Sequence, residues 1–168
     1  FVKMQGLSLK KMTKKELASL VNEKLDIMYL DAKCGLDYRN IFELIVAVSL
    51  SAQTTDVSVN KVTPILFSKY KDAYSLANAD IKDVEDIIRS IGLYKNKAKN
   101  IINLSKELIS KFNGEVPNTL DELMSLSGVG YKTASVVLVE GFKIPAFPVD
   151  THISRISKRV GIVKESLD

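Results

Sequence analysis

The sequence contains one cysteine, one histidine and no tryptophan among its 168 residues. With Cys34 alone, the chain cannot form an internal disulfide, nor hold a metal cluster through cysteines of its own. With His152 alone, it cannot build a metal site from several imidazoles, and no metal site is expected. No apolar run approaches the ~18 residues of a membrane-spanning helix, so we expect no membrane partner. So little cysteine use favours a reducing, intracellular location.

The composition is that of a globular protein with a mild excess of basic residues. Apolar residues make up 46% of the chain and charged residues 26%, which is ordinary for a folded domain. The net charge of +4 gives mild support to a polyanionic partner. A lysine-rich surface that keeps the protein in solution explains the same charge equally well. Because the chain starts at Phe1 and stops in a polar stretch at Asp168, we expect a fragment or trimmed ends.

Apolar residues recur at helical spacing along nearly the whole chain, and the predicted fold is all-α. Helices are predicted over about 13–29, 40–52, 95–112 and 131–140, after Asp56, after Asp80, around 120–124 and after Asp150. The helix over 40–52 is apolar on all sides, so we expect it at the centre of the core. Gly92 and Gly141 are expected to end their helices. In the last helix, Ile153, Ile156 and Val160 are expected to point inward.

Residues 126–134, Leu-Ser-Gly-Val-Gly-Tyr-Lys-Thr-Ala, place two glycines directly before a predicted helix. Gly128 and Gly130 let the chain turn tightly with its backbone exposed, and the first N–H groups of the helix suit a phosphate. Two helices joined in this way form a helix-hairpin-helix unit, which holds a DNA backbone without reading its sequence. Any two helices can also be joined by Gly-x-Gly, and that plainer interpretation stays open.

Lys132 stands in the first turn of the helix after this hairpin, at the positive end of the helix dipole. An amine there is easier to free for nucleophilic attack on the C1′ atom of a nucleotide, which would expel the base and leave an imine. A carboxylate such as Asp150 can activate the amine, stabilise positive charge on the sugar and move protons. The plainer interpretation of Lys132 is a solvated lysine in the first turn of a helix, and that of Asp150 is a helix N-cap.

Two other turns carry candidate DNA-contacting residues. Gln53, in Leu-Ser-Ala-Gln-Thr-Thr-Asp, could fill a gap left in a DNA stack, although the spacing alone favours a capping turn. Leu93 follows Gly92 and could wedge between bases, or it could be an ordinary hydrophobic contact at a helix end. His152 is as compatible with a structural or capping role as with a functional one.

Several segments in the same order resemble the endonuclease III family of bifunctional DNA glycosylases. The similar segments are 47–60, 91–101, 113–117 and 126–159, within about three quarters of the chain, roughly residues 38–163. The resemblance implies a six-helix domain over 36–147, containing the helix-hairpin-helix motif at about 119–140. Residues 1–35 and 148–168 would belong to a second helical subdomain, truncated at its C-terminus, with the active-site cleft between the two.

The resemblance also implies roles for the site residues. Lys132 would be the nucleophile and Asp150 its catalytic partner, while Gln53 and Leu93 would insert into the DNA stack. The implied DNA-binding residues are Gln53, Leu93, Gly128, Val129, Gly130, Thr133 and His152. The implied activity is removal of an oxidised pyrimidine flipped out of duplex DNA, followed by β-elimination that nicks the strand. The partner would be double-stranded DNA with damaged bases or abasic sites, bound by a monomer.

The sequence departs from the family pattern in identifiable places. Ser127 stands where the family usually has proline, and Tyr131 where it usually has a basic residue. The family's C-terminal four-cysteine loop is absent, so a 4Fe–4S cluster is expected only if a missing C-terminal segment supplies the cysteines. A monovalent cation on the carbonyls of the hairpin is a further expectation from the resemblance.

Two alternative functions are compatible with the sequence. A monofunctional relative, such as the adenine-specific mismatch glycosylase, would use the aspartate and a water, and the hairpin lysine argues against it. A non-catalytic helix-hairpin-helix module would only bind DNA. The expected location is the cytoplasm or nucleoid in a bacterium or archaeon, and the nucleus or an organelle in a eukaryote.

Overall fold

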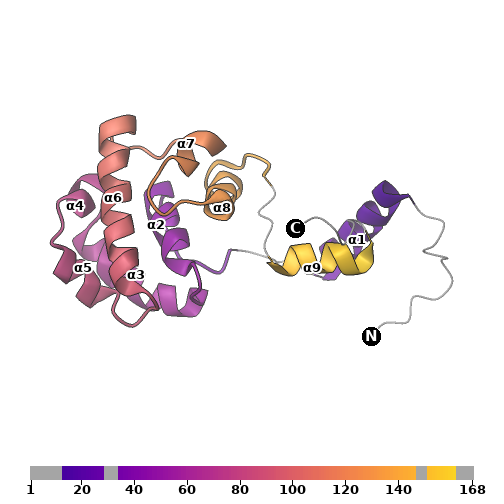
Figure 1. Cartoon of the computed structure of the whole chain (residues 1–168), viewed down its shortest axis with the longest axis horizontal. Helices are drawn as coiled ribbons and strands as arrows, with labels where there is room; N and C mark the ends of the chain where they lie inside the picture. The colour runs from indigo at the N-terminus through magenta and orange to yellow at the C-terminus, as the bar shows by residue number, and fades with distance from the viewer. Residues whose placement is uncertain (1–12, 29–33, 147–150, 162–168) are drawn as a thin grey trace. The chain divides into compact units, whose positions relative to one another are not determined.

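The computed structural model describes residues 13–28, 34–146 and 151–161, and all regular elements within these ranges are helices. The chain divides into two compact units, Cys34–Pro148 on the one hand and Phe1–Lys33 with Val149–Asp168 on the other. The larger unit contains α2 (Ile41–Ser51), α3 (Asp56–Lys69), α4 (Ala73–Ala77), α5 (Ile81–Ile87), α6 (Tyr94–Phe112), α7 (Leu120–Met124) and α8 (Tyr131–Phe142) (Figure 1). The smaller unit contains α1 (Lys14–Met28) and α9 (Thr151–Val160). The all-α prediction is confirmed for the described residues.

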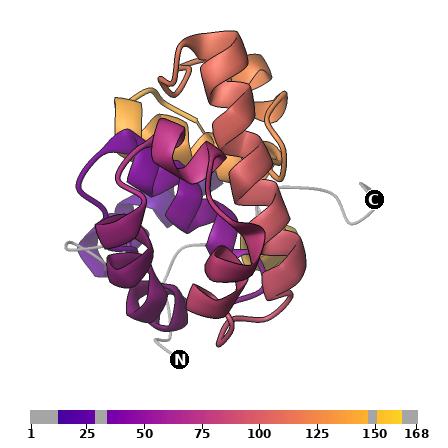
Figure 2. The same ribbon diagram turned by 90° about the vertical axis from the view of Figure 1, so that its left-hand side faces the viewer.

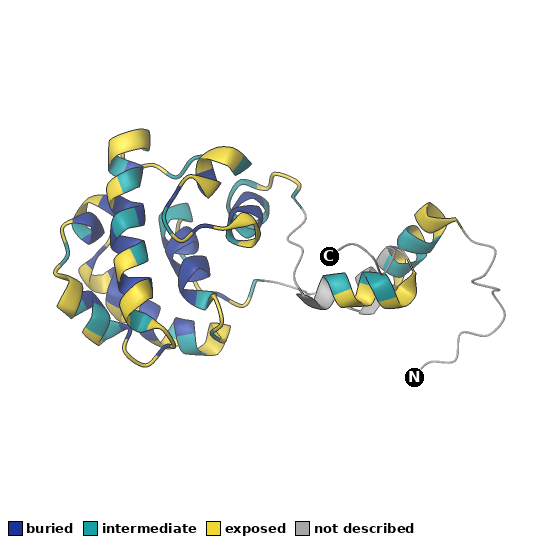
Figure 3. Ribbon diagram, viewed as in Figure 1, coloured by how far each residue is buried: buried dark blue, intermediate teal, exposed yellow. Residues whose placement is uncertain are grey.

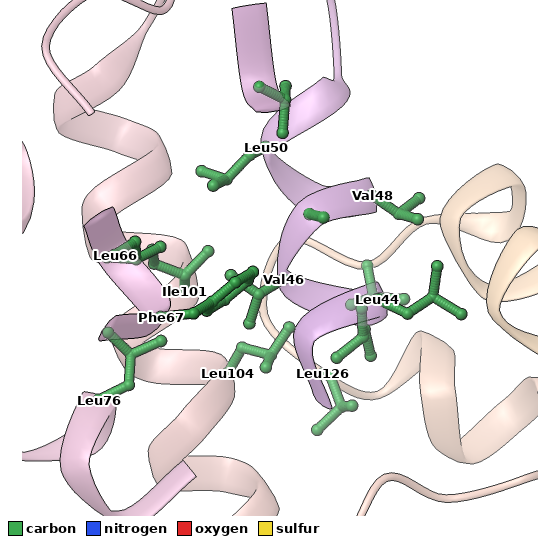
Figure 4. Packing of buried hydrophobic residues seen from close by; sticks show 14 of the residues in the cluster. Leu44, Val46, Val48, Leu50, Leu66, Phe67, Leu76, Ile101, Leu104 and Leu126 are labelled. Carbon is green, nitrogen blue, oxygen red and sulfur yellow. The ribbon is translucent and has the colours of Figure 1, made fainter. Parts of the chain in front are cut away.

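Helix α2 forms the centre of the larger unit's core. Every residue from Glu43 to Leu50 is buried, and Figure 3 shows the helix almost entirely in dark blue. It contacts α3, α6 and α8. In Figure 4, Phe67 of α3 lies beside Val46, while Leu44 and Val48 point to the other side of α2. The prediction of a buried central helix is confirmed, because apolar side chains on all its sides find partners.

Helix α6 carries the second main apolar stripe. Ile101, Leu104 and Leu108 are each at most 1% exposed, as their spacing predicts. The helix contacts α2, α4 and α5, and in Figure 2 it runs in salmon beside the shorter magenta helices. Asn113 and Gly114 end it in the left-handed conformation, at φ 54° and 85°, which confirms the predicted stop.

Helix ends differ from the predicted ones at two glycines. Helix α5 ends at Ile87, well before Gly92. Helix α8 continues through Gly141 and is capped by Lys143, which has a φ of 58°. Gly141 lies inside α8 because this helix approaches α2 closely, and a Cβ atom on Gly141 would lie 3.1 Å from Leu44 Cδ2. The glycine therefore serves helix packing, where the sequence suggested a helix end.

Two further differences concern α4 and α9. Helix α4 makes seven helices within residues 34–146, one more than predicted, and its five residues are too few for periodicity to reveal. Its start is fixed by a reciprocal cap between Asp72 and Ser75. In α9, Ile156 is 50% and Val160 36% exposed, so the expectation that they point inward is wrong, while the side chain of Ile153 lies outside the described residues. The described helices of this unit, 15 and 10 residues long, leave these two side chains partly uncovered.

We predict that Gly141→Val lowers the free energy of unfolding of the larger unit by about 1–3 kcal/mol, the usual cost of overpacking. The added carbons would meet Leu44 Cδ2 and Ile41 Cγ2, which lie 3.1 and 3.3 Å from the Cβ position. Urea denaturation followed by far-UV circular dichroism measures the change. Lys106→Val, at an exposed position of α6, controls for a β-branched residue in a helix. Equal losses in the two variants would contradict the packing explanation.

Candidate functional site

The hairpin between α7 and α8 is closed by its own backbone. The Val129 N–H donates to the Leu126 carbonyl at 3.1 Å, and the Ala134 N–H donates to the Gly130 carbonyl at 2.9 Å. Leu126 and Val129 are buried, whereas Gly128 and Gly130 are exposed. The apolar residues therefore anchor the turn and the glycines form its surface. Because the Val129 side chain is buried, a DNA partner would reach this residue through its backbone.

The structure gives different reasons for glycine at the two positions of the hairpin. Gly128 has a φ of +76°, and a Cβ atom there would lie 3.0 Å from Cβ of Asn100 in α6. Gly130 has a φ of −91°, which any residue adopts, and open space surrounds its Cβ position. A positive φ is thus required at Gly128 alone. Without a side chain, Gly130 leaves the backbone open to close approach by a partner.

The first turn of α8 follows this hairpin directly. Gly130 is the N-cap, and Tyr131, Lys132 and Thr133 are the first helical residues. The first N–H groups of a helix have no intrahelical acceptor, and Gly130 brings no side chain to cap them. The side chains of Tyr131 and Lys132 are exposed and that of Thr133 is half-buried. Lys132 therefore stands where the sequence predicted it, at the positive end of a helix.

Helix α6 braces the hairpin with two charged side chains. The Glu107 carboxylate accepts the Ser127 N–H at 2.6 Å and the Ser127 hydroxyl at 3.0 Å. Lys111 Nζ donates to the Ser125 carbonyl at 3.3 Å. A proline at position 127 could not donate the first of these bonds, because it has no N–H. Ser127, which departs from the family pattern, therefore attaches the hairpin to α6 through two hydrogen bonds.

Gln53 and Leu93 both have left-handed backbones, with φ of 54° and 58°. Such angles are uncommon for residues other than glycine, and holding them costs on the order of 1 kcal/mol or more. Leu93 is the N-cap of α6, and its side chain is 61% exposed. Gln53 is also exposed, in the turn that follows α2. Neither side chain contributes to the core, so both turns present their tips to solvent.

One face of α6 contacts the candidate site, and it was not identified from the sequence. Its polar residues Lys97, Asn100, Glu107 and Lys111 follow at helical spacing, which places them on one side of the helix. Lys97 Nζ donates to Thr54 Oγ1 at 2.6 Å, and the other three meet the hairpin segment 125–128. The signal was present in the sequence, because these polar residues run beside the apolar stripe of the same helix.

Two other predicted residues lie wholly or partly outside the described residues. Asp150 lies outside the described residues, and so does the side chain of His152, although His152 belongs to α9. Within the described ranges, no group of three or more His, Cys, Asp and Glu side chains could hold a metal ion. No helix of the part described is long and apolar enough to cross a membrane.

Comparison with known proteins identifies relatives of this architecture. Residues 46–168 match the family model of the HhH-GPD superfamily base excision DNA repair proteins. Endonuclease III of Bacillus subtilis is 51% identical over 142 residues, which are 84% of this chain and 65% of the relative. Endonuclease III of Synechocystis sp. is 46% identical over 162 residues, covering 96% of this chain and 74% of the relative. The chain thus spans about two thirds to three quarters of the length of these relatives.

Solved structures agree with the sequence relatives. A trapped covalent intermediate of an endonuclease III with DNA superposes with a TM-score of 0.87 at 49% identity, covering 94% of this chain and 73% of that chain. A thermostable thymine-DNA glycosylase has a TM-score of 0.77 at 24% identity, covering 86% of this chain and 67% of that chain, and shares the fold.

We predict that Glu107→Ala destabilises the hairpin by about 1–2 kcal/mol, because the Ser127 N–H and hydroxyl lose a charged acceptor at a partly solvated place. Amide hydrogen exchange at 125–130 should accelerate, while exchange in α2 stays unchanged. Glu107→Gln keeps one acceptor oxygen and should lose less. Glu115→Ala, at an exposed carboxylate just beyond α6, is the control for charge removal. Unaltered exchange at 125–130 in Glu107→Ala would show that the carboxylate does not hold the turn.

Proposed function

The chain belongs to the endonuclease III family of base excision DNA repair proteins, and on this premise we propose that it is a DNA glycosylase with AP lyase activity. The observation that carries the proposal is the position of Lys132, in the first turn of α8 directly after the glycine hairpin. The proposed substrate is an oxidised pyrimidine, flipped out of duplex DNA.

The chemistry follows from a primary amine at this position. Lys132 Nζ attacks C1′ of the extruded nucleotide, the bond from C1′ to the base breaks, and the base leaves with a proton. The nitrogen lone pair then opens the sugar ring: the C1′–O4′ bond breaks, O4′ takes up a proton, and the protonated imine at C1′ acidifies the C2′ proton. Loss of that proton expels the 3′ phosphate and nicks the strand. Asp150 is the carboxylate proposed to move these protons and to stabilise positive charge on the sugar.

The surrounding turns supply the proposed hold on DNA. The hairpin glycines and the first N–H groups of α8 suit a phosphate, and they carry no information about base sequence. Gln53 and Leu93 are proposed to occupy the space that the extruded nucleotide leaves, because both side chains are exposed in turns between helices. His152 is proposed as a further contact. The named relatives are bacterial, so the proposed place of action is DNA in the cytoplasm or nucleoid.

Two inorganic groups found in the family fit this chain differently. A monovalent cation suits the hairpin carbonyls, since the Leu126 oxygen accepts one hydrogen bond and keeps a second lone pair. Such a cation would add positive charge beside a bound phosphate. A four-cysteine iron–sulfur cluster does not fit the residues given, because Cys34 is the one cysteine in the sequence. No step of the proposed reaction uses either group.

We predict that the protein forms a covalent adduct with abasic DNA in the presence of borohydride, and that Lys132→Gln abolishes both the adduct and strand nicking. Duplex binding should remain, since it depends on many phosphate contacts and this change removes at most one. Lys143→Gln, an exposed lysine at the other end of α8, is the matched control. An adduct that survives in Lys132→Gln excludes this nucleophile. If the unmodified protein forms none, it is a monofunctional glycosylase or a binding module.

We further predict that Leu93→Ala slows base removal from a paired lesion more than it slows nicking at a ready-made abasic site. Filling the gap offsets part of the few kcal/mol that base extrusion costs, and an abasic site requires no extrusion of a base. Single-turnover rates on the two substrates measure the difference. Ile65→Ala, which truncates an exposed apolar side chain on α3, should leave both rates unchanged. Equal losses on the two substrates would assign Leu93 to packing.

A further inference from the structure

Lys97 is a lysine in an unusual environment. It is 6% exposed, whereas lysines are almost always at the surface unless a counter-charge pairs with them. Its partner in the described part of the chain is the neutral hydroxyl of Thr54, at 2.6 Å from Lys97 Nζ. Burial lowers the pKa of the Lys97 ammonium group. Burying this amine costs free energy, which its hydrogen bonds must offset.

Lys97 connects two turns of the chain, and Thr54, the acceptor of its side-chain hydrogen bond, lies 43 residues away in the sequence. Its backbone N–H donates to the Leu93 carbonyl at 3.0 Å, which is the first hydrogen bond of α6. Its side chain reaches Thr54, whose own N–H closes the neighbouring turn on the Ser51 carbonyl at 2.9 Å. One residue is therefore bonded to the N-cap Leu93 and to the residue that follows Gln53.

Both turns need an external restraint. Gln53 and Leu93 are left-handed residues without glycine's freedom, and such conformations persist only where surrounding structure holds them. Both side chains are exposed, so packing of Gln53 and Leu93 themselves does not supply that restraint. The hydrogen bonds of Lys97 contribute to it, because they attach both turns to the first turn of α6.

We propose that Lys97 is a positioning residue that couples the Gln53 turn to the Leu93 turn and thereby holds the two DNA-inserting side chains in a fixed relative position. The DNA-inserting role rests on the proposed function, whereas the coupling of the turns is a property of the DNA-free protein. Lys97 itself need not touch the substrate.

The test uses Lys97→Met, which keeps an unbranched apolar stem of similar length and removes the donor, and Thr54→Val, which removes the acceptor at similar volume. Hydrogen–deuterium exchange of the DNA-free protein is measured at 51–55 and at 92–96. Lys97→Met should accelerate exchange in both turns by about tenfold, the size expected for losing one hydrogen bond to a charged group. Thr54→Val should accelerate the distant Leu93 turn as well, and Thr54→Ser should restore it.

Catalysis provides the second readout. In single-turnover assays, both variants should lose more rate on a paired lesion than on an abasic site, and the double variant should be no worse than the worse single one. Lys99→Met, at an exposed position two residues along α6, is the matched control and should change nothing.

The outcomes separate this inference from the proposed function. If the unmodified protein forms no borohydride adduct, the proposed function fails, and the exchange data still decide whether the turns are coupled. If Lys97→Met does not fold, Thr54→Val carries the same test. A Leu93 turn whose exchange is unchanged in Thr54→Val, or additive losses in the double variant, would overturn the coupling.

Discussion

The attachment of three turns to one face of α6 is the constraint on which the candidate site depends. Lys97 holds the Gln53 turn, Leu93 is the N-cap of the same helix, and Asn100, Glu107 and Lys111 meet the hairpin. From Lys97 to Lys111 the helix rises by about 21 Å, at 1.5 Å per residue. A helix of this kind is stiff, so the turns keep fixed separations without touching one another. The adjacent apolar stripe packs α6 against α2, α4 and α5, which prevents the helix from shifting.

The balance of charge along this face explains why a carboxylate is tolerated at a hairpin suited to an anion. An unpaired Glu107 would repel a phosphate and lower the affinity for DNA. Here each of its two oxygens accepts one hydrogen bond, from the N–H and from the hydroxyl of Ser127, and these donors offset part of the carboxylate's charge. Lys111 lies one helical turn further on and carries the opposite charge to the same segment. The negative charge of Glu107 thus serves to hold the turn, and the exposed Lys132 lies in the first turn of α8, directly after the hairpin.

The parts of the fold that were predictable from the sequence are those where a local pattern decides the outcome. The buried helix over 41–51 and the stripe of Ile101, Leu104 and Leu108 follow from apolar spacing, because burial obeys that spacing directly. Lys132 was placed by glycine and helix-start signals within a few residues. Gly141 was wrongly predicted to end a helix, and the burial of Lys97 was not predicted, because no local pattern decides either outcome. A glycine inside a helix and a lysine inside a core are explained only by residues distant in sequence, Leu44 in one case and Thr54 in the other.

The proposed roles are divided unevenly between the two units of the chain. The hairpin, Lys132, Gln53 and Leu93 all belong to Cys34–Pro148, whereas Asp150 and His152 belong to the segment Val149–Asp168. Most of the proposed contacts to the DNA backbone and stack are therefore preorganised by a single core, that of α2 and α6. The proposed nucleophile shares this core with the turns that would extrude the nucleotide, so attack on C1′ depends on the same rigid helix that positions Gln53 and Leu93. In the proposed reaction, base extrusion and imine formation would thus be linked through α6, while proton transfer by Asp150 would depend on the other unit of the chain.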